Sequence, residues 1–152
     1  MSLRRGLTLE TPRERHLLDK WIAKVRTWAS ERPGVIGILL VGSHARGSAT
    51  PASDIDFVLL VTDTRPYLSD RAWARAFGEV EREELEDWGR VQCLRIWYVS
   101  GAEVEWGLAT IEWIGVPLDA GTQHVLLGGY RIIYDREGVL ESRLASLNLA
   151  DN

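Results

Sequence analysis

The sequence predicts an α/β (α+β) fold in which helices flank a mixed β-sheet. Short apolar segments such as VIGILLVG and IDFVLLVTD are typical of strands covered on both faces. Amphipathic segments alternate with them, and the order of elements contains both a hairpin and a helical crossover. With 152 residues, 45% apolar and 26% charged, the chain is long enough to bury a core. We therefore expect a single domain over residues 1–152.

The first predicted element is an N-terminal helix at about residues 11–30. Thr11 suits the N-cap, Pro12 suits the first helical position, and Glu14 can complete a capping box. The helix is expected to end near Ser30, before a Pro-Gly pair. Its apolar side chains recur at helical spacing and include Leu18, Trp21, Ile22, Val25 and Trp28.

The core of the domain is expected at about residues 34–115. Its predicted elements are, in order, the strand VIGILLVG, the loop SHARGSATPAS, the strand IDFVLLVTD, a helix from Ser69 to about Asp87, and the strands VQCLRIWYVS and AEVEWGLAT. The last two are expected to form a hairpin at Ser100-Gly101. The acidic run at 79–87 is typical of a solvated helix face. A C-terminal strand and helix follow within about residues 120–150, after a small helix at 120–128.

Composition also narrows the cellular setting. The only cysteine, Cys93, excludes an internal disulfide, fits a reducing compartment and lies in an apolar run typical of a buried thiol. No segment approaches the roughly 20 apolar residues of a membrane span, and the N-terminus does not resemble a signal peptide. The formal net charge of -4 indicates no general attraction to nucleic acid. We expect a cytoplasmic protein without membrane or nucleic-acid partners.

The segment from Val41 to Gly47 has the features of a phosphate-binding turn. Gly42 lets backbone N–H groups approach a ligand closely, and the Ser43 hydroxyl adds a donor beside them. Arg46 can reach a phosphate from the same segment. A Gly-Ser turn alone is more often only a turn.

Two acidic residues follow at the start of the next strand. Asp54 and Asp56 are two apart, so strand geometry places both carboxylates on one face. Such a pair beside apolar residues is unfavourable unless it is protonated or matched by cations. A divalent cation with oxygen ligands satisfies both, and Mg²⁺ is the usual ion where phosphates complete the shell. Together with the preceding turn, the pair predicts a site for metal and nucleoside triphosphate.

The run GSHARGSATPASDID resembles the signature of the DNA polymerase beta-like nucleotidyltransferase superfamily, and its wording is similar to the minimal and aminoglycoside nucleotidyltransferases of bacteria. The resemblance implies a nucleotidyltransferase-type mixed sheet, two Mg²⁺ ions and loss of pyrophosphate from a nucleoside triphosphate, for which we expect ATP. It assigns the β- and γ-phosphates to Gly42 and Ser43. We also expect Arg46 and Ser53 to contact the nucleotide. The resemblance assigns metal binding and catalysis to acidic residues that include Asp54 and Asp56.

The family also has a third carboxylate on a later strand, where aspartate is the more common residue. The segment AEVEWG offers Glu103 and Glu105, which should face the same way. Glu105 is preferred because it lies deeper in the strand. Its roles would be to bind metal and to accept the acceptor's proton. An inert surface acid is the alternative.

The acceptor is left open by these residues. A hydroxyl of an aminoglycoside-like small molecule and a hydroxyl of a partner protein are both compatible with the resemblance, and a homodimer could complete the acceptor side. Trp97, Trp106 and Trp113 either pack in the core or line an acceptor or base pocket. The alternative to an enzyme is a catalytically silent nucleotide- or partner-binding module, for example one like an antitoxin.

Overall fold

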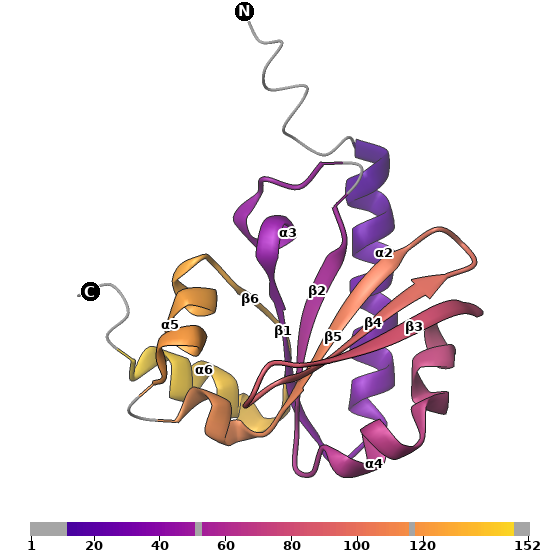
Figure 1. The fold of residues 1–152 in the computed structure, drawn as a ribbon. Helices are drawn as coiled ribbons and strands as arrows, with labels where there is room; N and C mark the ends of the chain where they lie inside the picture. Colours follow the sequence, from indigo (N-terminus) through magenta and orange to yellow (C-terminus); the bar gives the residue numbers. More distant parts are fainter. Residues whose placement is uncertain (1–11, 51–52, 116–117, 148–152) are drawn as a thin grey trace, which may run out of the picture.

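A computed structural model describes residues 12–50, 53–115 and 118–147 of the chain (Figure 1). The strands in this part form one sheet in the order β3-β4-β5-β2-β1-β6. They are β1 (Val35–Val41), β2 (Ile55–Val61), β3 (Val80–Asp87), β4 (Gln92–Tyr98), β5 (Glu103–Ala109) and β6 (Arg131–Asp135). Only β2 and β5 pair in parallel among the described strands, and the other pairs are antiparallel. The predicted mixed sheet is confirmed.

Helices cover both faces of this sheet, as the sequence predicts (Figure 1). They are α2 (Pro12–Ser30), α3 (Gly42–Arg46), α4 (Arg65–Ser69), the 3-10 helix η1 (Arg71–Phe77), the 3-10 helix η2 (Ile111–Ile114), α5 (Ala120–Leu127), the 3-10 helix η3 (Arg136–Gly138) and α6 (Val139–Ala145). The predicted end of the first helix at Ser30 is confirmed, as is the β4–β5 hairpin. Thr11, the expected N-cap, lies outside the described residues.

One face of the sheet packs against α2 and η1 through a continuous aromatic core. Trp106 is fully buried there, with its ring stacked on Phe57 at 5.1 Å and tilted against Phe77 at 5.0 Å between centroids. Trp28 from α2 meets Trp73 from η1 at 5.7 Å. Trp106 therefore belongs to the core, and the alternative that it lines a pocket is wrong.

The opposite face is only partly covered. On β1, β2 and the end of β5, apolar side chains pack beneath η2, α5 and α6, and they include Leu39, Val58, Leu60 and Ala109. The remaining part of this face carries polar side chains from β2, β5, β4 and β3, such as Asp56, Glu105 and Arg95, which lie half-buried. The helices thus divide one face into an apolar half and a polar half.

Two local predictions are wrong. The expected loop after β1 begins with a single helical turn, α3, because Gly42 (φ 75°) turns the chain out of the strand and Gly47 (φ 78°) caps the turn. The expected helix at residues 69–87 is η1 followed by the edge strand β3. Gly78 (φ 148°) ends η1, and pairing with β4 outweighs the helix propensity of the Glu- and Arg-rich stretch.

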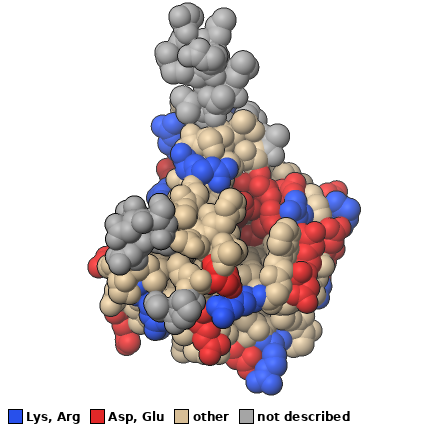
Figure 2. Space-filling model, turned by 60° about the vertical axis from the view of Figure 1, so that its left-hand side comes forward, with Lys and Arg blue, Asp and Glu red and all other residues tan. Residues whose placement is uncertain are grey.

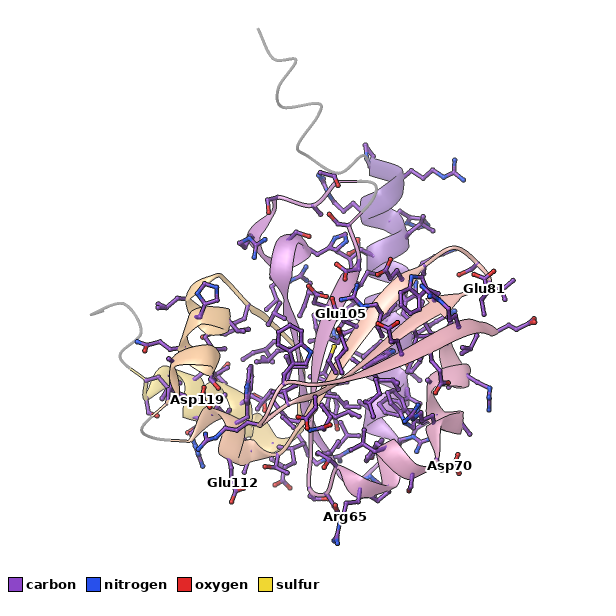
Figure 3. The ribbon with its side chains drawn as sticks, in the orientation of Figure 1. Arg65, Asp70, Glu81, Glu105, Glu112 and Asp119 are labelled. Carbon is purple, nitrogen blue, oxygen red and sulfur yellow. The ribbon has the colours of Figure 1, made fainter. Side chains whose placement is uncertain are left out.

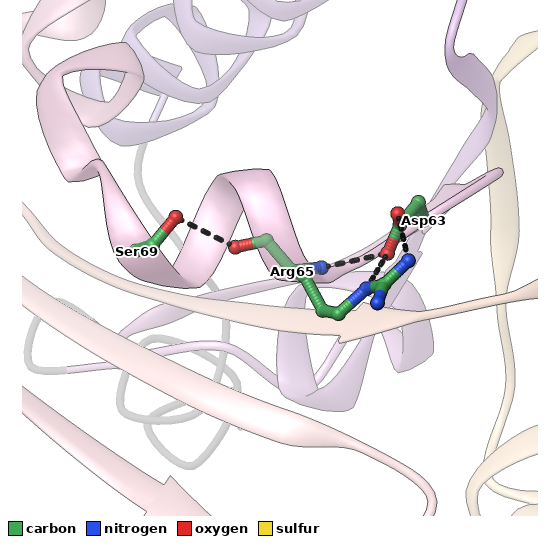
Figure 4. Close-up of polar contacts among 3 residues, drawn as sticks. All are labelled: Asp63, Arg65 and Ser69. Atoms are coloured by element: carbon green, nitrogen blue, oxygen red, sulfur yellow. Dashed lines mark hydrogen bonds and ion pairs between the residues drawn. The ribbon is translucent and has the colours of Figure 1, made fainter.

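The chain leaves β2 through a short polar turn that starts α4. The Asp63 carboxylate accepts hydrogen bonds from the backbone N and the Nε of Arg65, both at 3.0 Å, and Ser69 Oγ donates to the Arg65 carbonyl (Figure 4). These hydrogen bonds lower the pKa of Asp63. Charged side chains thus follow β2 at the end of the strand that is opposite to Asp56.

In the part of the chain that the structure describes, no helix combines the length and apolarity needed to cross a membrane.

Arg136 connects the C-terminal segment to the end of α2. Its Nη2 donates to the carbonyls of Ala29 and Arg32 at 3.1 and 2.8 Å, and its Nε donates to the Val35 carbonyl at 2.9 Å. The guanidinium therefore adds a second hydrogen bond to the Ala29 and Arg32 carbonyls, which already accept from backbone N–H groups, and so links the helix end to the C-terminal segment.

Replacing this guanidinium by an apolar chain should destabilise the fold. We expect Arg136→Met to lower the free energy of unfolding by about 1.5–3 kcal/mol, because charged hydrogen bonds to two part-buried carbonyls and one exposed carbonyl are lost. Urea unfolding followed by circular dichroism measures this. Arg131→Met, at an exposed arginine of β6, is the control and should change stability by less than about 0.5 kcal/mol. Equal effects of the two substitutions would contradict the role of Arg136.

Candidate active site

Three carboxylates meet on the polar half of the sheet. Asp56 lies in β2 directly beside Glu105 in the parallel strand β5, and Asp54 precedes β2 on the same face. Carboxylate oxygens of Asp54, Asp56 and Glu105 all lie within 4.8 Å of one another. Glu105 is labelled in Figure 3, in the upper part of the sheet. The structure therefore brings together the three acids that the sequence analysis selected.

Gly42 lies against the second of these acids. Val41 pairs with Asp56 across β1 and β2, so the chain turns into α3 immediately above the Asp56 carboxylate. A Cβ at Gly42 would overlap with Asp56 Oδ2, and the φ of Gly42 is +75°. Two separate features therefore favour glycine at this position: the positive φ of the backbone and the close approach of the Asp56 carboxylate.

The other candidate phosphate contacts lie at the same end of the sheet. A hollow between α3 and α5 is lined by Gly42, Arg46, Asp56 and Gly128, among others. The side chain of Arg46 runs along the backbone of the Gly128-Gly129 turn, where a Cβ on Gly129 would lie 3.4 Å from Arg46 Cγ. Gly128 and Gly129 were not among the predicted site residues, because in the sequence they indicate only the end of a helix.

Ser53 has a local role in the segment before the acids. Its hydroxyl accepts a hydrogen bond from the Thr50 backbone N at 2.9 Å, and its own backbone N donates to the Thr50 carbonyl at 3.0 Å. These hydrogen bonds hold Ser53 next to Thr50, immediately before Asp54. A contact between Ser53 and a nucleotide stays a prediction.

The acids strongly perturb one another. Burial, followed by the charges of Asp54 and Glu105, raises the pKa of Asp56 to about 8. Burial, then the hydrogen bond and charge of Glu105, raises the pKa of Asp54 to about 6. Burial opposes ionisation of Glu105 as well. Its pKa is nevertheless lowered, because hydrogen bonds from Asp54 and Cys93 and the charge of Arg95 favour its carboxylate form.

Arg95, on β4, is the cation that faces the cluster. Its Nη2 lies 2.8 Å from Glu105 Oε2, and its Nη1 lies 2.9 Å from Glu103 Oε2 and 3.9 Å from Asp54 Oδ2. Glu103 is thus held by Arg95 and, within the described chain, is not part of the three-acid cluster. Arg95 was not among the predicted site residues, although its pairing with Glu105 follows from the β4–β5 hairpin.

Cys93 supports Glu105 from the same strand as Arg95. Its buried Sγ donates to Glu105 Oε1 at 3.0 Å, and burial together with the Glu105 carboxylate raises the pKa of the thiol. The expected buried thiol is therefore present, but it is a hydrogen-bond donor to the site rather than a simple apolar residue. Glu105 is thus held on both oxygens.

Acidic side chains and uncharged surface lie next to each other on the molecule. Figure 2 shows acidic side chains gathered on one face of the molecule, with uncharged surface next to them. A second hollow, of about 320 Å³, borders Asp56 and Glu105 and extends beneath α5, η2 and the β3–β4 turn. Trp113 lines it and is 4% exposed, so this tryptophan belongs to both the core and a pocket wall.

Comparison with known structures finds similar folds in larger proteins. The Cid1 poly(U) polymerase with Mg and 3'-dATP bound is 15% identical with a TM-score of 0.54, covering 68% of this chain and 33% of that one. A cytoplasmic RNA terminal U-transferase is 16% identical with a TM-score of 0.53 and the same coverage. An aminoglycoside 6-adenyltransferase from Bacillus subtilis is 14% identical with a TM-score of 0.46, covering 60% and 35%. The chain thus spans about a third of each.

The family of the chain is identified by comparing its sequence with a family model. No curated protein matches the chain. The model of the nucleotidyltransferase domain matches residues 22–98, which is half of the chain and includes Gly42, Ser43, Asp54 and Asp56 but ends before Glu105. Together with the shared fold, this match confirms the resemblance inferred from the Gly-Ser and Asp-x-Asp spacing. The chain belongs to the nucleotidyltransferase domain family.

Proposed function

We propose that the protein transfers a nucleoside monophosphate from a nucleoside triphosphate, ATP, to a hydroxyl acceptor in the presence of Mg²⁺, with release of pyrophosphate. The observation that carries this proposal is the convergence of Asp54, Asp56 and Glu105 within 4.8 Å, beside the Gly42 turn. A purely structural role does not account for three converging carboxylates, two of which have a raised pKa.

The donor atoms fit Mg²⁺. They are all carboxylate oxygens, which are the ligands this ion prefers. The Oδ1 of Asp56 is buried and has no hydrogen-bond partner within the described residues, as expected of an atom that binds a cation. When bound, two such ions would neutralise the triphosphate and favour an in-line displacement.

Residues of the α3 turn would hold the triphosphate. The first N–H groups of a helix have no partner inside it, and those of Gly42 and Ser43 begin α3. Arg46, supported along the Gly128-Gly129 turn, would offset phosphate charge. Glu105 would accept the proton of the acceptor hydroxyl. Its lowered pKa keeps it ionised at neutral pH, and Arg95 and Cys93 fix its orientation.

Removing one ligand charge tests the metal assignment. Asp56→Asn should reduce magnesium-dependent pyrophosphate release by at least about 1,000-fold, because the central ligand of the site is lost. Labelled ATP with a panel of hydroxyl compounds provides the assay. Asp19→Asn, at an exposed acid of α2, is the control and should keep full activity. Activity of Asp56→Asn within tenfold of the unmodified protein would contradict the assignment. Tight nucleotide binding without pyrophosphate release in the unmodified protein would favour a silent binding module.

The metal-free protein should lose stability as the pH rises. The folded-state pKa of Asp56 is raised from 3.8 to about 8, so between these values the unfolded chain releases this proton first. The stability linked to Asp56 is present below about pH 4 and is lost as the pH rises through 8. The stability linked to Asp54 is lost in the same way as the pH rises through about 6. Thermal unfolding in chelator at pH 5 and pH 8 measures the effect.

Magnesium should reverse this loss, with a larger rise in melting temperature at pH 8 than at pH 5, because it binds the ionised carboxylates. Asp56→Asn should remove most of both the pH dependence and the magnesium effect. An equal response of this variant and the unmodified protein would show that other groups cause the pH dependence.

A side chain at Gly42 should damage the site more than the fold. Gly42→Ala should weaken Mg²⁺ binding by at least about tenfold, because its Cβ overlaps with Asp56 Oδ2 and displaces this carboxylate. Gly138→Ala is a matched control, since Gly138 has φ +72° and open space around its Cβ position. Both variants should lose about 1 kcal/mol of stability from backbone strain. Equal magnesium affinities in the two would disprove the close-approach argument.

A further inference from the structure

The hollow of about 320 Å³ beside the acids has the size of a small-molecule pocket. Asp56 and Glu105 form its upper end. Its floor is formed by Val58 of β2 and Gly107 of β5, and a Cβ on Gly107 would lie 3.1 Å from Val91 Cγ1. The missing side chain at Gly107 therefore helps to keep the hollow open.

The walls of this hollow come from segments outside the central strands. They include Trp113 of η2, Val125 of α5 and Trp88 of the β3–β4 turn. Trp88 is 66% exposed, which is unusual for so large an apolar side chain, and it leaves an indole ring at the rim. Such a ring can pack on a planar ligand.

Charged groups on the walls are already matched. Arg90 Nε lies 3.3 Å from Asp119 Oδ2 across the lower end, and Glu105 is paired with Arg95 at 2.8 Å. The rest of the lining is mostly apolar, with four valines in addition to the two tryptophans. Among the described residues that line the hollow, every carboxylate is thus matched by Arg90, by Arg95 or by metal once the acids hold it, which disfavours a polycationic ligand.

Two hollows meet at the acids and differ in character. Gly42 and Arg46 line only the hollow beside α3, while Glu105 lines only the apolar one. Asp56 lines both. A triphosphate held by Gly42 and Arg46 would thus have its reacting phosphorus near Asp56, and a molecule in the apolar hollow would meet it from the side of Glu105.

Resting on the proposed function, we propose that the apolar hollow is the acceptor site and that the acceptor is a small, uncharged molecule carrying its hydroxyl on an apolar ring. The acceptor oxygen forms a bond to the α-phosphorus, and the bond from this phosphorus to the oxygen bridging to the β-phosphate breaks. Pyrophosphate leaves with that electron pair. The hydroxyl proton passes to the Glu105 carboxylate and then to water.

The test uses 2-naphthol as the ring probe and kanamycin as a polycationic comparison. Their binding to the full chain is measured by saturation-transfer NMR with Mg²⁺ and a methylene-linked ATP analogue present. We expect 2-naphthol to bind and to be nucleotidylated with ATP, and kanamycin neither to bind nor to compete. Val58→Phe, which fills the floor of the hollow, should weaken the binding of 2-naphthol by at least about tenfold. It should change the affinity for the ATP analogue by less than about twofold. Trp88→Ala should act in the same direction.

Val99→Phe, at an exposed position of the β4–β5 turn, is the control and should alter neither affinity. A parallel loss of analogue affinity in Val58→Phe would overturn the proposal, because the hollow would then hold the nucleoside. Binding of kanamycin in place of 2-naphthol, or no binding of 2-naphthol, would also overturn it. Binding of 2-naphthol without pyrophosphate release from any acceptor would instead refute the transfer reaction and leave a ligand site.

Discussion

The parallel pairing of β2 with β5 is the constraint on which the site depends. It places Asp56 directly beside Glu105, while the antiparallel neighbours on either side add Val41 and Arg95 to the same row. Acids from segments about 50 positions apart are thereby fixed without any loop between them. Side chains on paired strands are held more precisely than side chains on loops, which suits chemistry that depends on position and charge.

Repulsion among the carboxylates in this row explains the roles of several neighbouring side chains. Buried carboxylates cannot all ionise without cations, and in the metal-free protein Arg95 matches Glu105 while Asp56 keeps a pKa of about 8. The Cys93 thiol, held protonated by burial, donates to the remaining Glu105 oxygen. The site is thus arranged so that Glu105 is ionised and oriented before metal arrives, whereas Asp56 is left without a compensating group.

Local sequence signals were sufficient where the chemistry is local. The Gly42-Ser43 turn, the spacing of Asp54 and Asp56, and the apolar runs of β1 and β2 all follow from neighbouring residues. Non-local features were not predictable in this way. The stretch 80–87 has helix-forming residues but becomes β3 because β4 offers an edge to pair with, and Trp88 carries no signal until that hairpin exists.

In the proposed reaction, the C-terminal elements would limit which acceptor reaches the acids. In the sheet alone, Val58 and Gly107 would lie on an open face beside Glu105, exposed to any acceptor. Packing of η2, α5 and α6 on that face buries Leu60, Trp113 and Leu126 and turns the remaining surface into a bounded apolar hollow. A wall of this kind rejects charge more strongly than it selects shape, so in the proposed reaction the hollow would restrict the acceptor mainly by polarity. The residues that line it come both from the matched residues 22–98, as Val58 and Trp88 do, and from the segment beyond them, as Trp113 and Val125 do.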